Sequence, residues 1–288
     1  MIIWIASYPK SGNTWIRTII SQLIFDQKTS DHNWLLKLHK KIDAYPKLKH
    51  FNDINPSTKN KNIYTKDETI MNWIVSQKII NRNRNPKFFK THNMYCSIEV
   101  DNKKYSFTDL DNTLGVIYIV RDPRNVITSL KNHFFFKSYN EALSMFLDKR
   151  SWGGVLENEI PQALGSWEDH YKSWSLFPKN YILFKYEEIL SNPKKQIKRL
   201  IKYLEKFAPI KYDEEKIDDI IHKTSFENLR TLENKGFFLE KSVNNTTKET
   251  TNFFFLGPKN DFKKILDEKT IYAIEKKFKK TMQELGYL

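Results

Sequence analysis

The sequence predicts an α/β protein with a central parallel sheet and helices on both faces of that sheet. Two observations predict this class. Short apolar runs typical of buried strands alternate with amphipathic helical segments, and three of these runs lead directly into a helix start. A chain of 288 residues can bury a sizeable core, so we expect a single domain over residues 1–288.

The first strand is expected at residues 2–6, which are apolar and partly β-branched, as in a strand buried on both faces. It is followed by the turn "YPKSGNTW" at residues 8–15, and apolar side chains then recur at helical spacing as far as residue 24. This strand, turn and helix make the first half of a βαβ unit.

The next segment, residues 26–85, is polar and has weak periodicity, with helical hints at 34–42 and 67–80. We therefore expect an elaboration outside the sheet that faces the substrate, together with a second such elaboration at 133–165. Two further strands are expected after the first elaboration, at residues 87–92 and 115–120.

Two helix-start signals mark the remaining junctions. The pair Asp122–Pro123 supplies an N-cap and a proline at the first helical position. The pair Asn192–Pro193 does the same after a strand expected at 181–186, and a last amphipathic helix is expected at 271–285. Strands that alternate with helices in this way are typical of a parallel sheet.

In open parallel sheets, ligands bind beyond the carboxyl ends of the strands. The side chains found at or just after these ends are Lys10, His92, Arg121 and Tyr186. The turn after the first strand also offers backbone N–H groups at a helix amino terminus, where Gly12 permits close approach. Further donors in this turn come from Ser11, Asn13 and Thr14. The turn therefore suits an anion.

This turn is not the usual nucleotide loop, because Lys10 precedes Gly12 and the chain contains no GxxxxGK[ST] sequence. No acidic pair that would hold magnesium is obvious, which disfavours an ATP-dependent kinase. Arg121 and Ser129 are separated across a helix start and together suit a terminal phosphate, which arginine can bind bidentately. The alternative is that Arg121 pairs with a nearby carboxylate such as Asp122.

Composition restricts the remaining possibilities. The net charge of +14 suits an anionic partner, although a coding bias toward lysine would produce the same excess. Cys96 is the single cysteine, which excludes an intrachain disulfide, and the seven histidines lack metal-ligand spacing, so no metal is expected. No apolar run approaches the roughly 20 residues of a membrane span, so we expect a cytoplasmic protein without a membrane anchor.

Five motifs, in chain order, carry a resemblance to a known family. They are "YPKSGNTW", "KTH" at 90–92, "RDPRNVITS" at 121–129, "FKYEEI" at 184–189 and "TSF" at 224–226. The chain resembles the sulfotransferases that use 3'-phosphoadenosine 5'-phosphosulfate, and most of all their cytosolic type. This resemblance implies a P-loop-like three-layer fold and sulfuryl transfer to a hydroxyl or amine, with this nucleotide as co-substrate.

The resemblance also implies roles for individual residues. His92 matches the catalytic base, with Lys90 as a neighbouring cation, and residues 10–14 match the cradle of the donor's 5'-phosphosulfate. Lys10 would bridge the transferring group and the leaving oxygen. The matches to the 3'-phosphate ligands are Arg121 and Ser129, and those to the positions around the adenine are Trp15, Tyr186, Thr224 and Phe226. Trp15, Tyr186 and Phe226 could equally be core aromatics.

The chain departs from the family pattern near its carboxyl end. Where the cytosolic enzymes carry an Arg-Lys-Gly stretch that clasps the 3'-phosphate, this chain has Phe255, Leu256 and Gly257. Lys259, a residue of "LEKSVNNTTKE" at 239–249, or backbone N–H groups at Gly257 could compensate. The family's short dimer motif is not recognisable, which leaves the oligomeric state open.

Two other functions remain as alternatives: a P-loop-like nucleotide or sugar phosphotransferase, and a basic nucleic-acid-binding protein. A phosphotransferase would need a metal, and a nucleic-acid-binding protein should bind long polynucleotides in a salt-dependent way. We favour the sulfotransferase, which acts on a small-molecule or glycan acceptor and not on nucleic acid. The sequence does not identify the acceptor.

Overall fold

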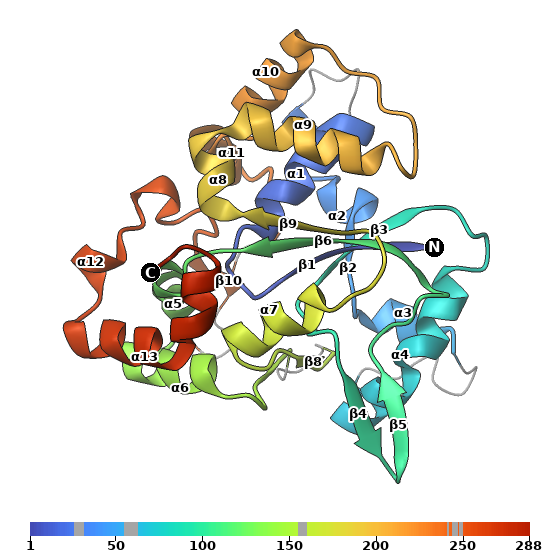
Figure 1. Cartoon of the computed structure of the whole chain (residues 1–288). Coiled ribbons are helices and arrows are strands. Elements are labelled where there is room, and N and C mark those ends of the chain that lie inside the picture. The colour runs from blue at the N-terminus through green and yellow to red at the C-terminus, as the bar shows by residue number, and fades with distance from the viewer. Residues whose placement is uncertain (26–31, 55–62, 155–159, 241, 244–246, 248–249) are drawn as a thin grey trace. The chain divides into compact units, whose positions relative to one another are not determined.

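The computed structural model describes residues 1–25, 32–54, 63–154, 160–240, 242–243, 247 and 250–288 (Figure 1). The chain forms two compact units that are interleaved in sequence. Unit 1 consists of residues 1–8, 42–119 and 148–183, and unit 2 of residues 9–41, 120–147 and 184–288. The organisation as a single domain stays a prediction.

A five-stranded sheet has the order β2-β3-β1-β6-β9. Its strands are β2 (Asp43–Ala44), β3 (Lys87–Thr91), β1 (Ile2–Ser7), β6 (Thr113–Val120) and β9 (Tyr181–Lys185). β1 pairs in parallel with β3 and β6, and β2 pairs in parallel with β3. All six residues of β1 are buried, as the apolar run at 2–6 predicts for a central strand. The predicted α/β class with a central parallel sheet is confirmed.

The expectation that residues 26–85 lie outside the sheet is wrong, because β2 is an edge strand of that sheet. A strand of two residues is too short to show an alternating pattern. The helical hint at 67–80 is confirmed by α4 (Lys66–Ile80), whose Thr65 and Glu68 form a capping box.

The other elements of this region are short. The helical hint at 34–42 corresponds to the 3₁₀ helix η1 (His32–Trp34) and to α2 (Leu38–Lys41), and α3 (Leu48–Asn52) follows β2. Residues 26–31 and 55–62 of the expected elaboration lie outside the described residues, as do 155–159 of the second one.

Unit 1 also contains a hairpin that sequence analysis missed. β4 (Ser97–Val100) and β5 (Lys103–Ser106) pair antiparallel and lie against α4, as Figure 1 shows. The turn residues Asp101 and Asn102 both have positive φ angles, which aspartate and asparagine tolerate better than most residues. In the same unit, α7 (Trp167–Ser175) packs against β1, and β7 (Trp152–Gly153) pairs with β8 (Gln162–Ala163).

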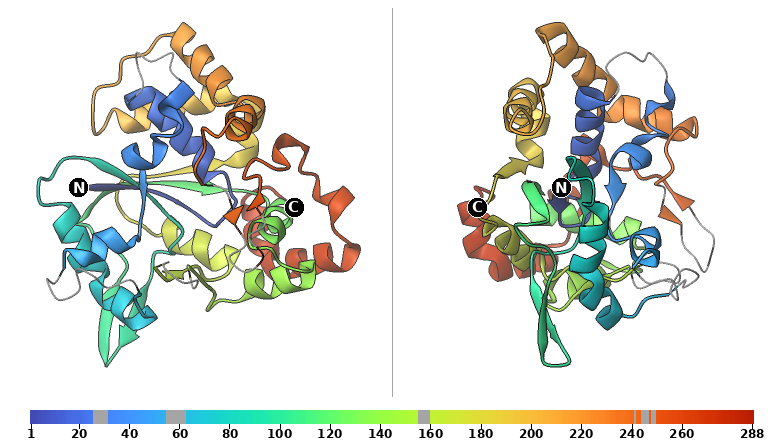
Figure 2. Two further views of the ribbon diagram at one scale, coloured as in Figure 1. Left: turned by 180° about the vertical axis from the view of Figure 1, so that it is seen from behind. Right: turned by 90° about the vertical axis from the view of Figure 1, so that its right-hand side faces the viewer.

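Unit 2 is mostly helical. It contains α1 (Asn13–Ile24), α5 (Pro123–His133), α6 (Tyr139–Leu147), α8 (Tyr186–Ser191), α9 (Pro193–Leu204), α10 (Glu214–Lys223), α11 (Phe226–Asn234), η3 (Gly257–Lys259), α12 (Phe262–Ile265) and α13 (Glu268–Glu284), with the short strands β10 (Ser242–Val243) and β11 (Thr250–Thr251). Within this unit α10 packs on α9, and α13 packs on α6 (Figure 2).

Both predicted helix starts in unit 2 are confirmed. The Asp122 carboxylate accepts a hydrogen bond from the Arg124 N–H at the start of α5, and the Asn192 side chain accepts one from the Lys195 N–H at the start of α9. Tyr186 is one of the residues at which a boundary differs from the prediction, because it begins α8 and does not end the strand before it. None of the helices in the described ranges is long and apolar enough to cross a membrane.

Candidate functional site

Gly12 fixes the shape of the turn that follows β1. Its φ angle of 101° lies in the left-handed region, which favours glycine. A Cβ atom at this position would lie 2.7 Å from Cδ2 of Tyr186, closer than carbon atoms can pack. Lys10, two residues earlier, also has a positive φ of 66°. Position 12 therefore needs a glycine for two independent reasons: the left-handed φ angle and the lack of room for a Cβ atom.

The turn ends at the amino terminus of α1, whose N-cap is Gly12 and has no side-chain capping hydrogen bond. The first N–H groups of a helix have no acceptor within the helix, so this end can bind an anion. The Ser11 side chain is fully buried, and its Oγ has no hydrogen-bond partner among the described residues. A buried hydroxyl without a partner is costly, which is consistent with a site that a ligand fills.

The ring of Tyr186 links three other residues of the predicted site. It packs against Gly12, lies edge-on to Trp15 with ring centroids 5.4 Å apart, and lies 4.1 Å from the guanidinium carbon of Arg121. Nη1 of Arg121 also donates a hydrogen bond to the carbonyl oxygen of Lys10. The structure therefore brings together Lys10, Gly12, Trp15, Arg121 and Tyr186.

The Lys10 side chain lies over an aromatic ring that sequence analysis did not select. Its Nζ is 3.7 Å from the ring centroid of Phe253, a cation–π contact. The segment that carries Phe253 is held by α11, because the carboxylate of the fully buried Glu233 accepts hydrogen bonds from the N–H groups of Phe253 and Phe254. The backbone that carries the Phe253 ring is thus held by hydrogen bonds, and the ring lies against the lysine.

Ser129 lies on α5 and is tied to the carboxyl-terminal part of the chain. Nδ2 of Asn260 donates to Ser129 Oγ at 3.3 Å and to the Asn125 carbonyl at 2.8 Å, and Asn260 Oδ1 accepts from Thr128 Oγ1. Asn260 is not among the site residues that the sequence predicts. The sequence signal that could have indicated a role for Asn260 is a polar side chain directly after a Gly-Pro-Lys turn.

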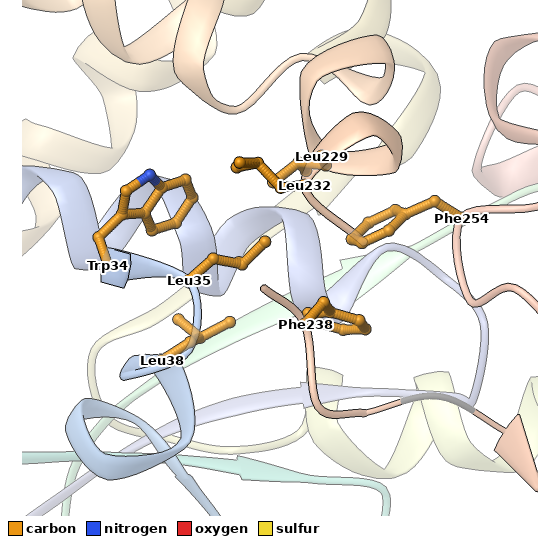
Figure 3. Packing of buried hydrophobic residues seen from close by; sticks show 7 residues of the cluster. All are labelled: Trp34, Leu35, Leu38, Leu229, Leu232, Phe238 and Phe254. Atoms are coloured by element: carbon orange, nitrogen blue, oxygen red, sulfur yellow. The ribbon is translucent and has the colours of Figure 1, made fainter. Parts of the chain in front are cut away.

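Trp15 and Phe226 lie beside a buried apolar cluster. The cluster contains Trp34, Leu35, Leu38, Leu229, Leu232, Phe238 and Phe254 (Figure 3), and Trp15, Phe226, Phe237 and Phe253 pack against it. A Cβ on Gly257 would lie 2.3 Å from Cε2 of Phe226, and the φ angle of Gly257 is 54°. Both predicted aromatics are partly buried, so they combine a core contact with exposed ring surface.

The other predicted contacts around the nucleotide differ in their surroundings. Thr224 is buried, and its hydroxyl donates to the Ile220 carbonyl, so its oxygen can act only as an acceptor for a ligand. Phe255 is 50% exposed, and Lys259 is also exposed. Residues of 239–249 are among those that could compensate for the missing basic contacts to the 3'-phosphate. Of these, residues 241, 244–246 and 248–249 lie outside the described residues.

Lys90 and His92 belong to unit 1 and are placed by β3. Lys90 is the fourth residue of β3 and is half-buried, and His92 follows the last residue of that strand. Nδ1 of His92 lies 2.7 Å from the carbonyl oxygen of Ser7. Because a carbonyl oxygen can only accept, Nδ1 carries a proton, and in the neutral ring Nε2 carries the lone pair. His92 is thus held in the tautomer that can accept a proton at Nε2.

These features define an α/β protein with an anion-binding turn after its first strand, an arginine stacked on a tyrosine, and a histidine held as a base. The family model described as "Sulfotransferase domain" matches residues 2–286. The chain belongs to this family, and the predicted family membership is confirmed.

Curated relatives support the same assignment. The chain is 27% identical over 241 residues to mouse "Sulfotransferase 1B1", and this match covers 79% of this chain and 65% of that protein. It is 28% identical to rat "Sulfotransferase 1A1" over 78% of this chain and 66% of that protein. The match therefore spans slightly less than two thirds of the length of these two relatives. "Cytosolic sulfotransferase 8" of Arabidopsis thaliana is 26% identical over 91% of this chain and 70% of its own length.

Solved structures share the fold at lower identity. Mouse sulfotransferase SULT7A1, complexed with PAP, has a TM-score of 0.57 and 19% identity, covering 98% of this chain and 83% of its own. Retinol dehydratase in a complex with retinol and PAP has a TM-score of 0.60 and 18% identity, covering 98% of this chain and 81% of its own.

Proposed function

We propose that this protein transfers a sulfuryl group from 3'-phosphoadenosine 5'-phosphosulfate to a hydroxyl or amine of a small-molecule or glycan acceptor, by in-line displacement. The observation that carries the proposal is the turn after β1. Its buried Ser11 hydroxyl has no partner among the described residues, and its Gly12 leaves no room for a Cβ. Both are expected of a cradle shaped for an anion at a helix amino terminus.

The residues of unit 2 fit this nucleotide. Residues 10–14 would hold the 5'-phosphosulfate, and Arg121 with Ser129 would hold the 3'-phosphate. Trp15, Tyr186, Thr224, Phe226 and the N–H of Gly257 would contact the remainder of the nucleotide. When bound, the nucleotide supplies an activated sulfuryl group and a phosphate leaving group. Lys10, ordered by Phe253, would stabilise the charge that develops on the leaving oxygen.

The residues of unit 1 would handle the acceptor. His92 would take the acceptor's proton at Nε2 while its Nδ1–H stays bonded to the Ser7 carbonyl. Lys90 would stabilise negative charge at the reacting centre. Sulfuryl transfer resembles phosphoryl transfer in that charge spreads over equatorial oxygens between two axial atoms in line. It needs a cation for the leaving oxygen, the role proposed for Lys10, and a base for the acceptor, the role proposed for His92.

The decisive test is calorimetric titration with 3'-phosphoadenosine 5'-phosphate, followed by assay of sulfuryl transfer to a panel of phenols, alcohols and amines. We expect saturable binding and weaker binding of adenosine 5'-phosphosulfate, which lacks the 3'-phosphate. No heat of binding at millimolar ligand would refute the proposal. Turnover that requires magnesium would favour a phosphotransferase, and salt-dependent binding to long polynucleotides would favour a nucleic-acid-binding protein.

A further inference from the structure

The two residues that follow β3 have an unusual set of hydrogen bonds in unit 1. The ladder between β1 and β3 ends at Thr91, so the peptide groups of His92 and Asn93 need partners outside the strands. These partners come from α7, from the side chain of Gln162 in β8 and from the side chain of Thr91. The N–H of His92 donates to Gln162 Oε1, the N–H of Asn93 donates to Thr91 Oγ1, and the N–H of Ala163 donates to Asn93 Oδ1.

Two ring N–H groups of α7 hold the carbonyl oxygens of this segment. Nε2 of His170 lies 3.0 Å from the carbonyl oxygen of His92, and Nε1 of Trp174 lies 2.9 Å from that of Asn93. His170 and Trp174 are four residues apart, so both rings lie on one face of α7. Consecutive carbonyls are thus held by donors one helical turn apart.

The tautomer of His170 follows from its partners. Its Nε2 faces a carbonyl oxygen, which can only accept, so Nε2 carries the proton. Nδ1 therefore accepts, and the hydroxyl of Tyr118 donates to it at 2.8 Å. His170 is fully buried, and burial lowers its pKa to about 3, so it stays neutral at working pH. Tyr118 is also buried and lies on β6, an interior strand of the sheet.

These contacts form one chain of hydrogen bonds from the sheet to the base. Tyr118 donates to His170, His170 donates to the backbone of His92, and Nδ1 of His92 donates to the Ser7 carbonyl. The His92 backbone is held on its N–H and on its C=O, and its ring is held on Nδ1. Little freedom is left to the direction of Nε2.

We propose that His170 is a positioning residue for His92, and that it acts with Trp174 as a two-point clamp on the carbonyls of residues 92 and 93. Neither residue belongs to the predicted site, and the role of His170 rests on the proposed function of His92 as a base. A misplacement of about 1 Å at a reacting group can cost about a hundredfold in rate. The clamp therefore acts on turnover and not on binding of the nucleotide by unit 2.

The test compares three substitutions with a control on the same helix. His170→Leu removes the donor, His170→Gln keeps an amide N–H and an amide oxygen, and Trp174→Phe keeps a ring but removes the N–H. Lys172→Gln, on the exposed side of α7, is the control. We expect kcat to fall about 10–100-fold in His170→Leu and about 3–10-fold in Trp174→Phe. His170→Gln should recover most of the loss, and the control should match the wild type.

Binding of 3'-phosphoadenosine 5'-phosphate should stay within about twofold in every variant. A Trp174→Phe or His170→Leu protein with wild-type kcat, or a Gln variant as impaired as the Leu variant, would overturn the proposal. Since His170→Leu leaves buried groups unpaired and could prevent folding, Trp174→Phe and His170→Gln decide the matter in that case.

A second readout does not depend on activity. Nitrogen chemical shifts of the His92 ring report its tautomer, which we expect to be the Nδ1–H form in the wild type and a mixture in His170→Leu or Trp174→Phe. An unchanged tautomer with unchanged kcat would refute the clamp. A wild-type protein that shows the expected tautomer but neither binds the nucleotide nor transfers a sulfuryl group would refute the proposed function and leave the clamp standing.

Discussion

The ammonium group of Lys10 lies 3.7 Å from the ring centroid of Phe253, although the two residues are far apart in the sequence. A cation–π contact of this kind contributes about 0.5–2 kcal/mol. It gives a flexible lysine a fixed direction before the nucleotide binds.

Replacing this ring should therefore impair use of the donor. We expect Phe253→Leu to lower kcat/KM for the donor about 3–10-fold, because Lys10 loses the face that orders it. Phe253→Tyr keeps an aromatic face and should remain within about twofold of the wild type. Steady-state kinetics at varied donor concentration would measure both, and equal losses in the two variants would show that the ring face is not what matters.

His92→Ala should separate binding from turnover. Loss of a general base costs about 10²–10⁴-fold in rate, so we expect kcat to fall by that factor. Calorimetric affinity for 3'-phosphoadenosine 5'-phosphate should be unchanged, since unit 2 supplies its proposed contacts. Lys10→Ala should impair both. Normal turnover by His92→Ala would remove His92 from the mechanism.

Gly12→Ala should destabilise the protein and prevent nucleotide binding. The added methyl group would meet the Tyr186 ring at 2.7 Å in a backbone with φ of 101°. Gly236→Ala is a matched control, because its φ of 83° is also left-handed but nothing lies within 4 Å of the added carbon. We expect urea unfolding to show about 1 kcal/mol lost at Gly236 and about 2–4 kcal/mol lost at Gly12. Equal losses at the two positions would mean that the Tyr186 ring moves aside to accommodate the added methyl group.

Asp43 should make unit 1 sensitive to acid. Burial alone would raise the pKa of its carboxyl, but hydrogen bonds from His50, Lys47 and Lys49 outweigh burial and hold the net pKa well below its usual value. A depressed carboxyl pKa gives stability that is present above the unfolded value, about 3.9, and that is lost as pH falls. The pKa of His50 is lowered by burial, which also disfavours the folded state in acid.

We therefore expect the free energy of unfolding to fall as pH drops below about 6 through His50 and more steeply below about pH 4 through Asp43. Asp43→Asn should flatten the part below about pH 4 while lowering stability at neutral pH. Urea unfolding at several pH values would measure both effects. Asp218→Asn, whose carboxylate pairs with Lys194 at the surface, is the control and should leave the dependence unchanged. An equally steep pH dependence in Asp43→Asn would contradict this account.

The double substitution Phe255→Arg and Leu256→Lys should tighten nucleotide binding. The resemblance drawn from the sequence matches these positions to the basic residues that clasp the 3'-phosphate in the family, and Phe255 is half exposed. One new charge-assisted contact is worth about 1.5 kcal/mol, or roughly tenfold in affinity. The gain should vanish for adenosine 5'-phosphosulfate, which lacks the 3'-phosphate. An equal gain for both ligands would point to general charge attraction instead.

Much of the fold follows from local sequence signals. The apolar run at 2–6, the cap at Asp122 and the cap at Asn192 each predict an element that the structure contains. Two elements were not predicted. The edge strand β2 has only two residues and therefore no periodicity, and the Asp101–Asn102 turn of the β4–β5 hairpin lies between strands that are mostly polar.

The predicted site residues came from turn chemistry and from motifs in the chain. Phe253, Asn260 and His170 could not be found in this way, since their importance lies in contacts with residues distant in sequence: Lys10, Ser129 and His92. A phenylalanine, an asparagine or a histidine alone does not reveal its partner. Their roles become visible only when tertiary contacts are known.

The position of Tyr186 has a consequence for how this chain can diverge. Its ring contacts Gly12, Trp15 and Arg121. A substitution at any of the four residues therefore changes the contacts on which the others depend, and we expect the effects of their substitutions on stability to be strongly non-additive. We therefore expect the four residues to change together and not one at a time. Phe255 is half exposed, and it lies where the sequence predicts the departure from the family pattern.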